Sequence, residues 1–273
     1  KSMPLVVCTL FIRKQMKKIC KILILTSLLT HSCSMPKTDI TSPNGKICLS
    51  FNIDEEGSIS YNVTVDNTTF ITDSELGFEE FNNLNLKDNF EIINTTTSTK
   101  DETWTQIWGE NKIIHCHYNE MAVDMVNDDG ISLTMRFRIF DDGLGFRYEY
   151  KAENADSIII TDELTTFNIN GNGMSWSIPA NFETYELLYR TLPLNDVDNA
   201  NTPFTFKTEE GIYASIHEAA LTDFPEMTLF KTDENCNTDF HVNLAPYPDG
   251  IKARFSENSF KTPWRTIQIS DEA

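Results

Sequence analysis

The chain has 273 residues, of which 40% are hydrophobic and 11% aromatic, so it can bury a sizeable core and does not have the composition of a disordered protein. Its net charge is -19; six of its 22 Lys and Arg residues and none of its 41 acidic residues precede position 34, which leaves -25 for the remainder. Such a surface repels nucleic acid and anionic lipid and suits neutral or cationic ligands, although an excess of acids can also serve solubility alone.

The first part of the chain is predicted to be an export signal. Residues 1–15 read as upstream translation with no part in the fold, and Met16 reads as the true start. A basic stretch then precedes the apolar run 22–29, which is too short to cross a bilayer, because a spanning helix needs about 20 residues. The basic residues of this stretch are Lys17, Lys18 and Lys21.

Cys33 follows the apolar run with a small residue directly before it, as in the lipoprotein signals of bacteria. We therefore expect residues 16–33 to be a signal peptide that is cleaved before Cys33 and lipidated on its thiol, followed by a polar linker over residues 34–45. An ordinary signal peptide with an incidental cysteine is the alternative. Either interpretation predicts export to the periplasm or outer membrane of a Gram-negative bacterium.

From residue 46 onward apolar and polar residues alternate with a period of two, which is typical of β-strands with one buried face. An Asn-rich patch over residues 81–100 is expected to be an exposed loop. The predicted strands of this first half are 46–53, 58–65, 90–96, 112–118 and 121–126.

Two hairpins are the clearest local predictions. The hairpin 132–150 turns at Asp141-Asp142-Gly143, since glycine accepts a positive φ at little cost, and the hairpin 204–216 turns at Glu209-Glu210-Gly211. No segment of ten or more residues has a strong helical period, apart from one or two helical turns within 182–190. These patterns predict an all-β domain over residues 46–273, built as a sandwich of two large antiparallel sheets.

The cysteines and paired histidines of the body have unremarkable interpretations. Cys48, Cys116 and Cys236 are far apart and odd in number, so buried thiols are a better interpretation than a disulfide framework or a zinc site. His115 and His117 share one face of a strand but have no third ligand nearby in the sequence, which favours core or surface histidines over a metal site.

His217 and Glu218 stand at the end of a predicted strand. Side chains at a strand end can face a ligand, and a local hydrogen-bonded pair is the alternative. The sequence contains no GxSxG, HExxH, GxxxxGKS or EF-hand pattern, so no common catalytic or binding motif assigns a reaction.

The stretch 176–194 breaks the alternation and holds Pro179 and Pro193 near its ends. A long, aromatic and acidic connection in an all-β chain is either a packed surface loop or part of a site. Its Glu186 can place a hard carboxylate oxygen away from the β core, and Ca²⁺ takes six to eight such oxygens. One Glu cannot complete a calcium site, so other ligands would come from elsewhere, and a plain surface role for Glu186 stays open.

Six segments, in order along the chain, resemble the N-terminal domain of glycoside hydrolase family 97, a family of bacterial α-glucosidases and α-galactosidases. No one segment is decisive, but six in register over about 230 residues are specific. They are SPNGKICLSF (42–51), DDGLGFRYEY (141–150), WSIPANFETYELLYRTLPL (176–194), TPFTF (202–206), EAALTDFPEMTLF (218–230) and TPWRTIQI (262–269).

The resemblance implies a large β-super-sandwich of the galactose-mutarotase type, followed by a catalytic (β/α)₈ barrel and a small C-terminal β domain. The barrel carries the catalytic carboxylates, so none is expected in this fragment, which alone should be inactive. Members hydrolyse α-linked glucosides or galactosides and need Ca²⁺, which one Glu of the N-terminal domain ligates together with Glu residues of the barrel. Thr184-Tyr185-Glu186 matches that position, which gives Glu186 the role of calcium ligand, with Glu183 as the fallback.

Three functions are therefore weighed. The first is the N-terminal domain of a calcium-dependent, exo-acting α-glycosidase, with an α-glucosidase expected; its partners are an α-linked oligosaccharide and the protein's own barrel. The second is a cell-surface carbohydrate-binding lipoprotein without catalysis, which needs an exposed aromatic platform formed, for example, by Trp104, Trp108 or Tyr185. The third is a scaffold domain whose acidic loop only packs on a partner.

Overall fold

The computed structural model describes residues 38–82, 84–232 and 238–272. Within these ranges the chain forms 21 strands and one single-turn 3-10 helix, η1 (Leu194–Asp196), so the prediction of an all-β fold is confirmed. Residues 182–190, where one or two helical turns are predicted, contain no helix. The predicted signal peptide with Cys33, and Cys236 in the body, lie outside the described residues. No helix in the described ranges has the length and apolar character needed to cross a membrane.

One layer of the sandwich is a four-stranded antiparallel sheet in the order β1-β2-β3-β4. Buried and half-exposed residues alternate along β2 and β3, as the sequence predicts. Gly57 has a φ of 75° in the turn between them, a conformation that glycine adopts without strain. The strands are β1 (Asp39–Thr41), β2 (Ile47–Ile53), β3 (Ile59–Val65) and β4 (Thr68–Glu75). Because β1 pairs with β2, the sheet starts inside residues 34–45, where the sequence predicts a linker.

The other layer is a ten-stranded sheet in the order β13-β12-β15-β16-β21-β9-β8-β7-β6, with β20 paired to β9. The two predicted hairpins are present in it as β8–β9 and β15–β16. In chain order its strands are β6 (Phe90–Thr105), β7 (Ile113–Asn127), β8 (Ile131–Phe140), β9 (Gly143–Ala152), β12 (Gly173–Ser177), β13 (Arg190–Pro193), β15 (Phe204–Thr208), β16 (Tyr213–Ala219), β20 (Ser259–Lys261) and β21 (Trp264–Ser270).

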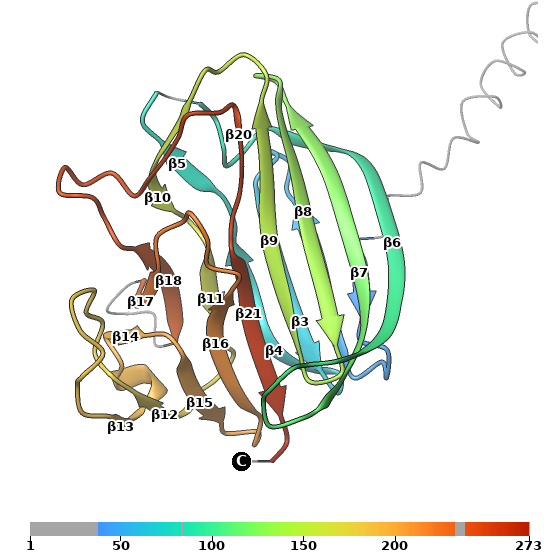
Figure 1. Ribbon diagram of the computed structural model, residues 1–273, viewed down its shortest axis with the longest axis vertical. Helices are drawn as coiled ribbons and strands as arrows, with labels where there is room; N and C mark the ends of the chain where they lie inside the picture. The colour runs from blue at the N-terminus through green and yellow to red at the C-terminus, as the bar shows by residue number, and fades with distance from the viewer. Residues whose placement is uncertain (1–37, 83, 233–237, 273) are drawn as a thin grey trace, which may run out of the picture. The chain divides into compact units, whose positions relative to one another are not determined.

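The core lies between these two layers, with the four-stranded sheet behind β8 and β9 in Figure 1. Phe51 of β2 packs on Phe137 of β8 with ring centroids 5.6 Å apart, and Tyr61 of β3 packs on Phe146 of β9 at 5.0 Å. All four side chains are completely buried, and each such burial contributes about 1.5–3 kcal/mol. The period-two alternation therefore gives each sheet one core face and one outer face.

Two smaller antiparallel sheets complete the described chain, and both contribute residues to the site described below. The first has the order β19-β10-β5 and the second the order β11-β18-β17-β14. Their strands are β5 (Phe78–Glu80), β10 (Ile158–Glu163), β11 (Thr166–Asn168), β14 (Asn199–Asn201), β17 (Met227–Lys231), β18 (Asp239–Leu244) and β19 (Ala253–Phe255).

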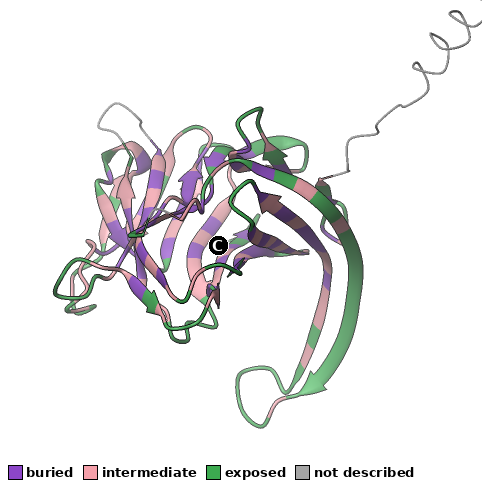
Figure 2. Ribbon diagram, turned by 90° about the horizontal axis from the view of Figure 1, so that it is seen from above, coloured by how far each residue is buried: buried purple, intermediate pink, exposed green. Residues whose placement is uncertain are grey.

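The β6–β7 hairpin extends well past the rest of its sheet. β7 pairs with β8 only from Tyr118 onward, whereas β6 stays paired with β7 as far as the Thr105–Ile113 pair. We call residues 101–117 the arm. Figure 2 shows the arm curving away from the body of the molecule as a ribbon with mostly exposed residues.

The β6–β7 hairpin confirms one sequence prediction, corrects another and extends a third. The predicted strand 90–96 is present in β6. Residues 97–100, the end of the Asn-rich patch expected to be a loop, also belong to β6, because β7 supplies backbone hydrogen-bond partners along the whole length of β6 and overrides the weak strand preference of these residues. The predicted strands 112–118 and 121–126 are one continuous strand, β7.

Candidate functional site

The predicted acidic stretch connects β12 to its neighbour β13, which is an edge strand of the ten-stranded sheet. β12 ends at Ser177 and β13 begins at Arg190, and these two residues pair directly across the strands. Residues 178–189 between them contain neither helix nor strand; we call them the acidic loop. A hairpin connection of this length is unusual, and such loops commonly carry function.

Two asparagines of β14 fix the start of the acidic loop. Asn199 Oδ1 accepts a hydrogen bond from the Ala180 N–H at 2.8 Å, and Asn201 Oδ1 accepts one from the Asn181 N–H at 2.8 Å. Asn201 Nδ2 also donates to the Asn181 carbonyl at 3.3 Å. Asn201 is 1% exposed, so a buried side chain satisfies both backbone groups of Asn181 and holds the loop against the sheet below it.

Two local turns orient the carboxylates of the acidic loop. Asn181 Oδ1 accepts from the N–H groups of Glu183, at 2.7 Å, and Thr184, at 3.2 Å. Thr184 Oγ1 then accepts from the Glu186 N–H at 3.0 Å. Such side-chain-to-backbone bonds fix a turn without a regular element. Both carboxylate residues, Glu183 and Glu186, are exposed, so they face outward from a backbone that is held in place.

Tyr185 connects the acidic loop to the segment before β17. Its hydroxyl donates to Glu226 Oε2 at 2.8 Å. Partial burial, together with the hydrogen bond to Glu226 and the negative charge of that carboxylate, raises the pKa of Tyr185 to about 12. The tyrosine is therefore a neutral hydrogen-bond donor at every physiological pH, and it holds the residue next to Glu186 in place.

A buried ion group lies directly beneath that segment. Arg265 of β21 and Glu218 of β16 are cross-strand neighbours joined by an ion pair. Arg265 also donates to Glu163 of β10, from Nε at 2.9 Å and from Nη2 at 2.5 Å. Glu218 Oε2 accepts from the Met227 N–H at 3.1 Å. Because Met227 follows Glu226, the ion group fixes the backbone that carries the partner of Tyr185.

The ion group is completely enclosed: the Arg265 and Glu163 side chains are 0% exposed and that of Glu218 is 4% exposed. Burial raises the pKa of the Glu218 carboxyl, although the charge of Arg265 opposes this. Sequence reasoning missed Arg265 and Glu163. The sequence signal that could have revealed Arg265 is its position in the alternating pattern of the strand. Arg265 is two residues before Ile267 and four before Ile269, so it occupies the same inward face as these buried residues.

The strand-end pair His217 and Glu218 does not act together. Successive residues of a strand point to opposite faces, so Glu218 points into the core, whereas His217 lies opposite Thr266 on the outer face. Burial lowers the pKa of His217, and its Nδ1 is buried without a hydrogen-bond partner in the described structure. Glu218 thus serves a long-range ion pair, not the local hydrogen-bonded pair or the ligand contact expected from the sequence.

The residues of the other sequence hypotheses lie elsewhere in the fold. His115 and His117 lie on the arm with rings 5.9 Å apart, and His115 Nε2 lies 2.6 Å from Asp101 Oδ1. Trp104 and Trp108 also belong to the β6–β7 hairpin, at the opposite edge of the ten-stranded sheet from Tyr185. All three aromatic residues named as candidates for a sugar-binding platform are exposed.

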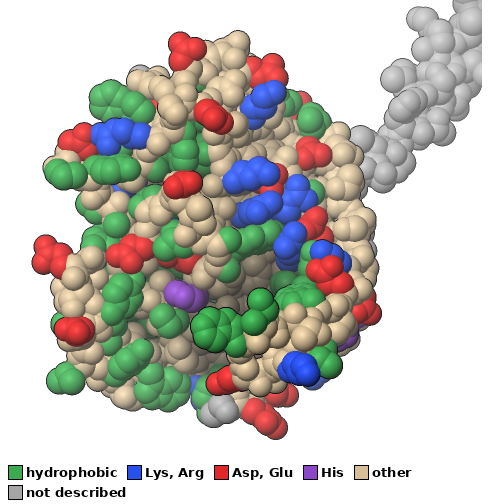
Figure 3. Space-filling model, viewed as in Figure 1, with side chains coloured by type: hydrophobic (Ala, Val, Ile, Leu, Met, Phe, Trp, Pro, Cys, Tyr) green, Lys and Arg blue, Asp and Glu red, His purple; other side chains and the backbone are tan. Residues whose placement is uncertain are grey.

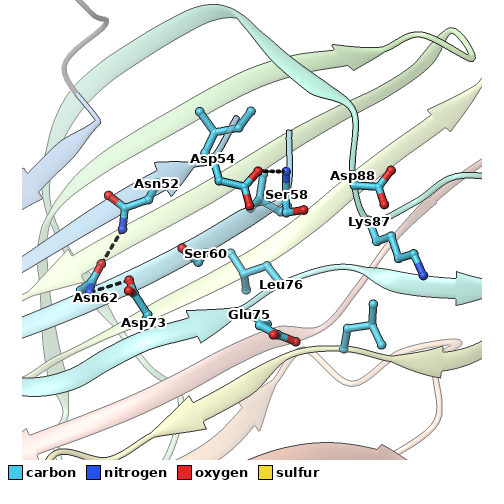
Figure 4. A pocket seen from close by; sticks show the side chains of 13 residues that line it. Asn52, Asp54, Ser58, Ser60, Asn62, Asp73, Glu75, Leu76, Lys87 and Asp88 are labelled. Atoms are coloured by element: carbon cyan, nitrogen blue, oxygen red, sulfur yellow. Dashed lines mark hydrogen bonds between the residues drawn. The ribbon is translucent and has the colours of Figure 1, made fainter. Parts of the chain in front are cut away.

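A polar groove of about 770 Å³ crosses the outer face of β2, β3 and β4 (Figure 4). Asn52 Nδ2 donates to Asn62 Oδ1 at 2.5 Å, and Asn62 Nδ2 donates to Asp73 Oδ1 at 2.9 Å. The lining contains no aromatic side chain, whereas small-molecule sites are mostly lined by apolar and aromatic groups. The groove is therefore a hydrogen-bonded sheet surface and not the candidate site.

The fold and the acidic loop together define a large antiparallel β-sandwich domain that presents an anchored, acidic connection at one sheet edge. The chain belongs to the glycosyl-hydrolase 97 N-terminal family, whose model matches residues 40–273. The identification made from the six sequence segments is thereby confirmed.

Solved structures agree with this assignment. The chain is 37% identical to a glycoside hydrolase family 97 enzyme from Pseudoalteromonas sp. strain K8, with a TM-score of 0.81, and the match covers 86% of this chain and 36% of that enzyme. That enzyme has been solved in complex with panose and with acarbose. The present chain thus spans about a third of the length of its relative.

More distant enzymes share the fold alone. A β-arabinopyranosidase is 20% identical with a TM-score of 0.75, over 85% of this chain and 40% of that one. A family 36 α-galactosidase from Geobacillus stearothermophilus is 8% identical with a TM-score of 0.55, over 86% of this chain and 40% of that one. The β-sandwich is therefore shared by enzymes named for different sugars, and it does not assign a substrate.

Proposed function

We propose that this chain is the N-terminal domain of a calcium-dependent, exo-acting α-glycosidase, and that the acidic loop walls the substrate pocket and donates a calcium ligand from Glu186. The observation that carries the proposal is the acidic loop itself. It exposes Glu186 while Asn201, Thr184 and Tyr185 hold its backbone. We favour an α-glucosidase, because the family 97 relative at 37% identity binds panose and acarbose.

The donor set of this chain fits a partial calcium site. No group of three or more His, Cys, Asp or Glu side chains within the described ranges could hold a metal ion. Ca²⁺ takes six to eight oxygen ligands, so Glu186 would supply one carboxylate, with Glu183 as the alternative, and the catalytic part of the enzyme would supply the others. Bound Ca²⁺ would supply a fixed positive charge beside the substrate.

In this proposal, the catalytic residues lie outside this chain. Glycosidases use a pair of carboxylates on either side of the scissile bond, and we place both in a (β/α)₈ barrel that follows this domain. The role left to this chain is to position Glu186 and to exclude water from one side of the pocket. We also propose that the protein is exported to the periplasm or outer membrane and anchored through Cys33.

The experiment compares the full-length enzyme with its Glu186→Gln variant. We expect the variant to need at least about tenfold more Ca²⁺ for half-maximal binding in calorimetry, equivalent to about 1.4 kcal/mol, and to lose hydrolysis of p-nitrophenyl α-glucoside at low Ca²⁺. Glu183→Gln is the matched control, since it removes an exposed carboxylate from the same loop. If only Glu183→Gln weakens calcium binding, Glu183 is the ligand.

Two results would count against the proposal. Unchanged calcium affinity in both variants would leave the acidic loop with a packing role alone. Turnover of p-nitrophenyl α-glucoside by the 273-residue chain without the remainder of the enzyme would show that the catalytic carboxylates lie within it.

A further inference from the structure

A pocket of about 340 Å³ lies beside the segment that anchors the acidic loop. It is lined by residues of two segments, 223–225 before β17 and 245–254, which leads from β18 into β19; we call it the side pocket. The Ala245 N–H donates to the Glu226 carbonyl at 3.0 Å, and the Glu226 carboxylate accepts from Tyr185. The side pocket and the acidic loop are therefore attached to the same residue.

Tyr247 presents an aromatic ring in the side pocket. The guanidinium carbon of Arg254 lies 4.9 Å from its ring, and even so 51% of Tyr247 is exposed. The turn that carries it is closed by two backbone hydrogen bonds, from Tyr247 N–H to the Ile251 carbonyl at 2.7 Å and from Gly250 N–H to the Tyr247 carbonyl at 2.9 Å. An exposed ring on a fixed turn is preorganised for a ligand, because binding has little chain left to order.

Phe224 supplies a second ring and joins the side pocket to the interior. It stacks on Phe255 with ring centroids 6.2 Å apart, and the guanidinium carbon of the buried Arg265 lies 5.6 Å from its ring. The segment that leads to it contains Ala220 and Asp223, with φ values of 55° and 52°. Aspartate tolerates this left-handed conformation, but alanine rarely adopts it. Backbone strain of this kind clusters at ligand sites, where packing holds the conformation.

The charged groups of the side pocket favour a neutral ligand. Lys252 Nζ already donates to the Leu244 carbonyl at 2.8 Å, and Arg254 already pairs with Asp249. The exposed Asp223 carboxylate has no hydrogen-bond or ion-pair partner within the described ranges. An anion would meet this unpaired carboxylate, whereas a neutral ligand with hydroxyl groups would donate hydrogen bonds to it.

We propose that the side pocket binds a pyranose ring of the oligosaccharide substrate, at a position beyond the ring that is cleaved. The C–H groups on a pyranose face pack on the Tyr247 ring, and its hydroxyls donate to Asp223 and accept from Arg254. Ligand sites have volumes of about 300–1,000 Å³ with apolar walls and few polar groups, so a pocket of about 340 Å³ suits a single ring.

This inference rests on the proposed function, because it assigns the side pocket to the same substrate that reaches the acidic loop. The connection after β18 forms the projection at the left edge of Figure 1, and Figure 3 shows hydrophobic and basic side chains together at that edge. The side pocket is thus at the periphery of the domain, where the distal part of a chain-like substrate can lie.

The test compares two substrates in the full-length enzyme and its Tyr247→Ala variant. Maltotetraose has four glucose rings, whereas p-nitrophenyl α-glucoside has one and cannot reach a distal site. We expect the variant to raise the KM for maltotetraose at least about tenfold without a change in kcat, because it removes binding that the ground state and transition state share. Both constants for p-nitrophenyl α-glucoside should stay unchanged, and Tyr247→Phe, which keeps the ring, should resemble the wild type.

Asp223→Asn tests the polar side of the site without disturbing the backbone, since asparagine also tolerates a positive φ. It should raise the KM for maltotetraose severalfold, while Glu257→Gln, which changes an exposed carboxylate outside the side pocket, should not. An unchanged KM for maltotetraose in both Tyr247→Ala and Asp223→Asn overturns the inference. An equal rise in KM for both substrates also overturns it, because the variants would then act on the acidic loop through Glu226.

Calorimetric titration with maltotetraose lets the two proposals fail separately, because it needs no turnover. A full-length enzyme that is inert toward α-glucosides but binds maltotetraose more weakly after Tyr247→Ala would remove the proposed activity and keep the distal site. An active enzyme whose affinity for maltotetraose is the same in wild type and Tyr247→Ala would do the reverse.

Discussion

Glu218 and Arg265 face each other across β16 and β21, and both side chains are enclosed in the interior. The second carboxylate oxygen of Glu218 accepts from the Met227 N–H. This geometry joins the centre of the ten-stranded sheet to the segment that carries Glu226, and through Glu226 to Tyr185 of the acidic loop. The interior of the domain and its candidate site are therefore one connected structure.

The first prediction concerns the loss of the buried cation. Arg265→Met should lower the free energy of unfolding by about 3–5 kcal/mol, because it leaves the carboxylates of Glu163 and Glu218 buried without their partner. Urea unfolding of the chain followed by tryptophan fluorescence measures this. Lys151→Met is the matched control, since the ion pair of its 55% exposed side chain with Glu153 should contribute less than about 1 kcal/mol. Equal effects of the two substitutions would contradict the prediction.

The second prediction tests whether Tyr185 positions the acidic loop. Tyr185→Phe removes the hydrogen bond to Glu226, which contributes about 0.5–1.5 kcal/mol, and leaves the ring in place. In the full-length enzyme we expect calcium affinity to fall severalfold with little change in the unfolding midpoint. Tyr189→Phe, at a position that is 70% exposed, should leave both quantities unchanged. A fall in unfolding midpoint without a change in calcium affinity would show a purely structural role.

The third prediction concerns the anchor at Asn201. Asn201→Ala removes the acceptor for the Asn181 N–H and the donor to the Asn181 carbonyl, and unsatisfied buried groups cost about 1–3 kcal/mol each. Amide hydrogen exchange should become faster at residues 180–186 and stay unchanged in the sheet, where β15 provides the reference. Uniform acceleration over the whole chain would instead indicate global destabilisation.

The fourth prediction is a pH dependence of stability. Burial alone raises the pKa of Glu120 and Glu149, but hydrogen bonds and charges from the neighbouring arginines outweigh it and hold both pKa values below the ordinary 4.5. Carboxylates with a lowered pKa stabilise the fold above 4.5, and this contribution is lost as the pH falls through the lowered values. The free energy of unfolding should therefore decrease below pH 4.5.

Urea unfolding between pH 7 and pH 3 measures this dependence. Glu149→Gln should be less stable at neutral pH and show a shallower decrease on acidification. Glu218 affects the pH dependence of stability in the opposite direction. Because burial raises its pKa, its contribution to the free energy of unfolding is larger at the lower end of this pH range. A wild-type chain with equal stability at pH 5 and pH 3 would contradict the prediction.

Local pattern predicted the strands better than it predicted their lengths. The hairpin 132–150 and the strand 46–53 are visible in the sequence because alternation and turn glycines act locally. The second half of β6 was not visible in the sequence, because residues 97–105 are exposed on both faces and owe their extended form to pairing with β7. Glu186 could be selected from its place in a non-alternating stretch, but its anchors Asn199 and Asn201 could not, since they belong to a later strand.

The sequence by itself determined the all-β class, the core faces of the main strands and the family of the chain. Period-two alternation and the family-specific segments each depend only on residues close together in the chain, so both can be recognised without the tertiary structure. Only the tertiary structure decided which distant residues meet. It enclosed Arg265 with Glu163 and Glu218, tied Tyr185 to Glu226, and gathered Arg138, Arg147 and Trp264 on one face. These contacts join segments far apart in the chain, and only sheet order and register bring them together.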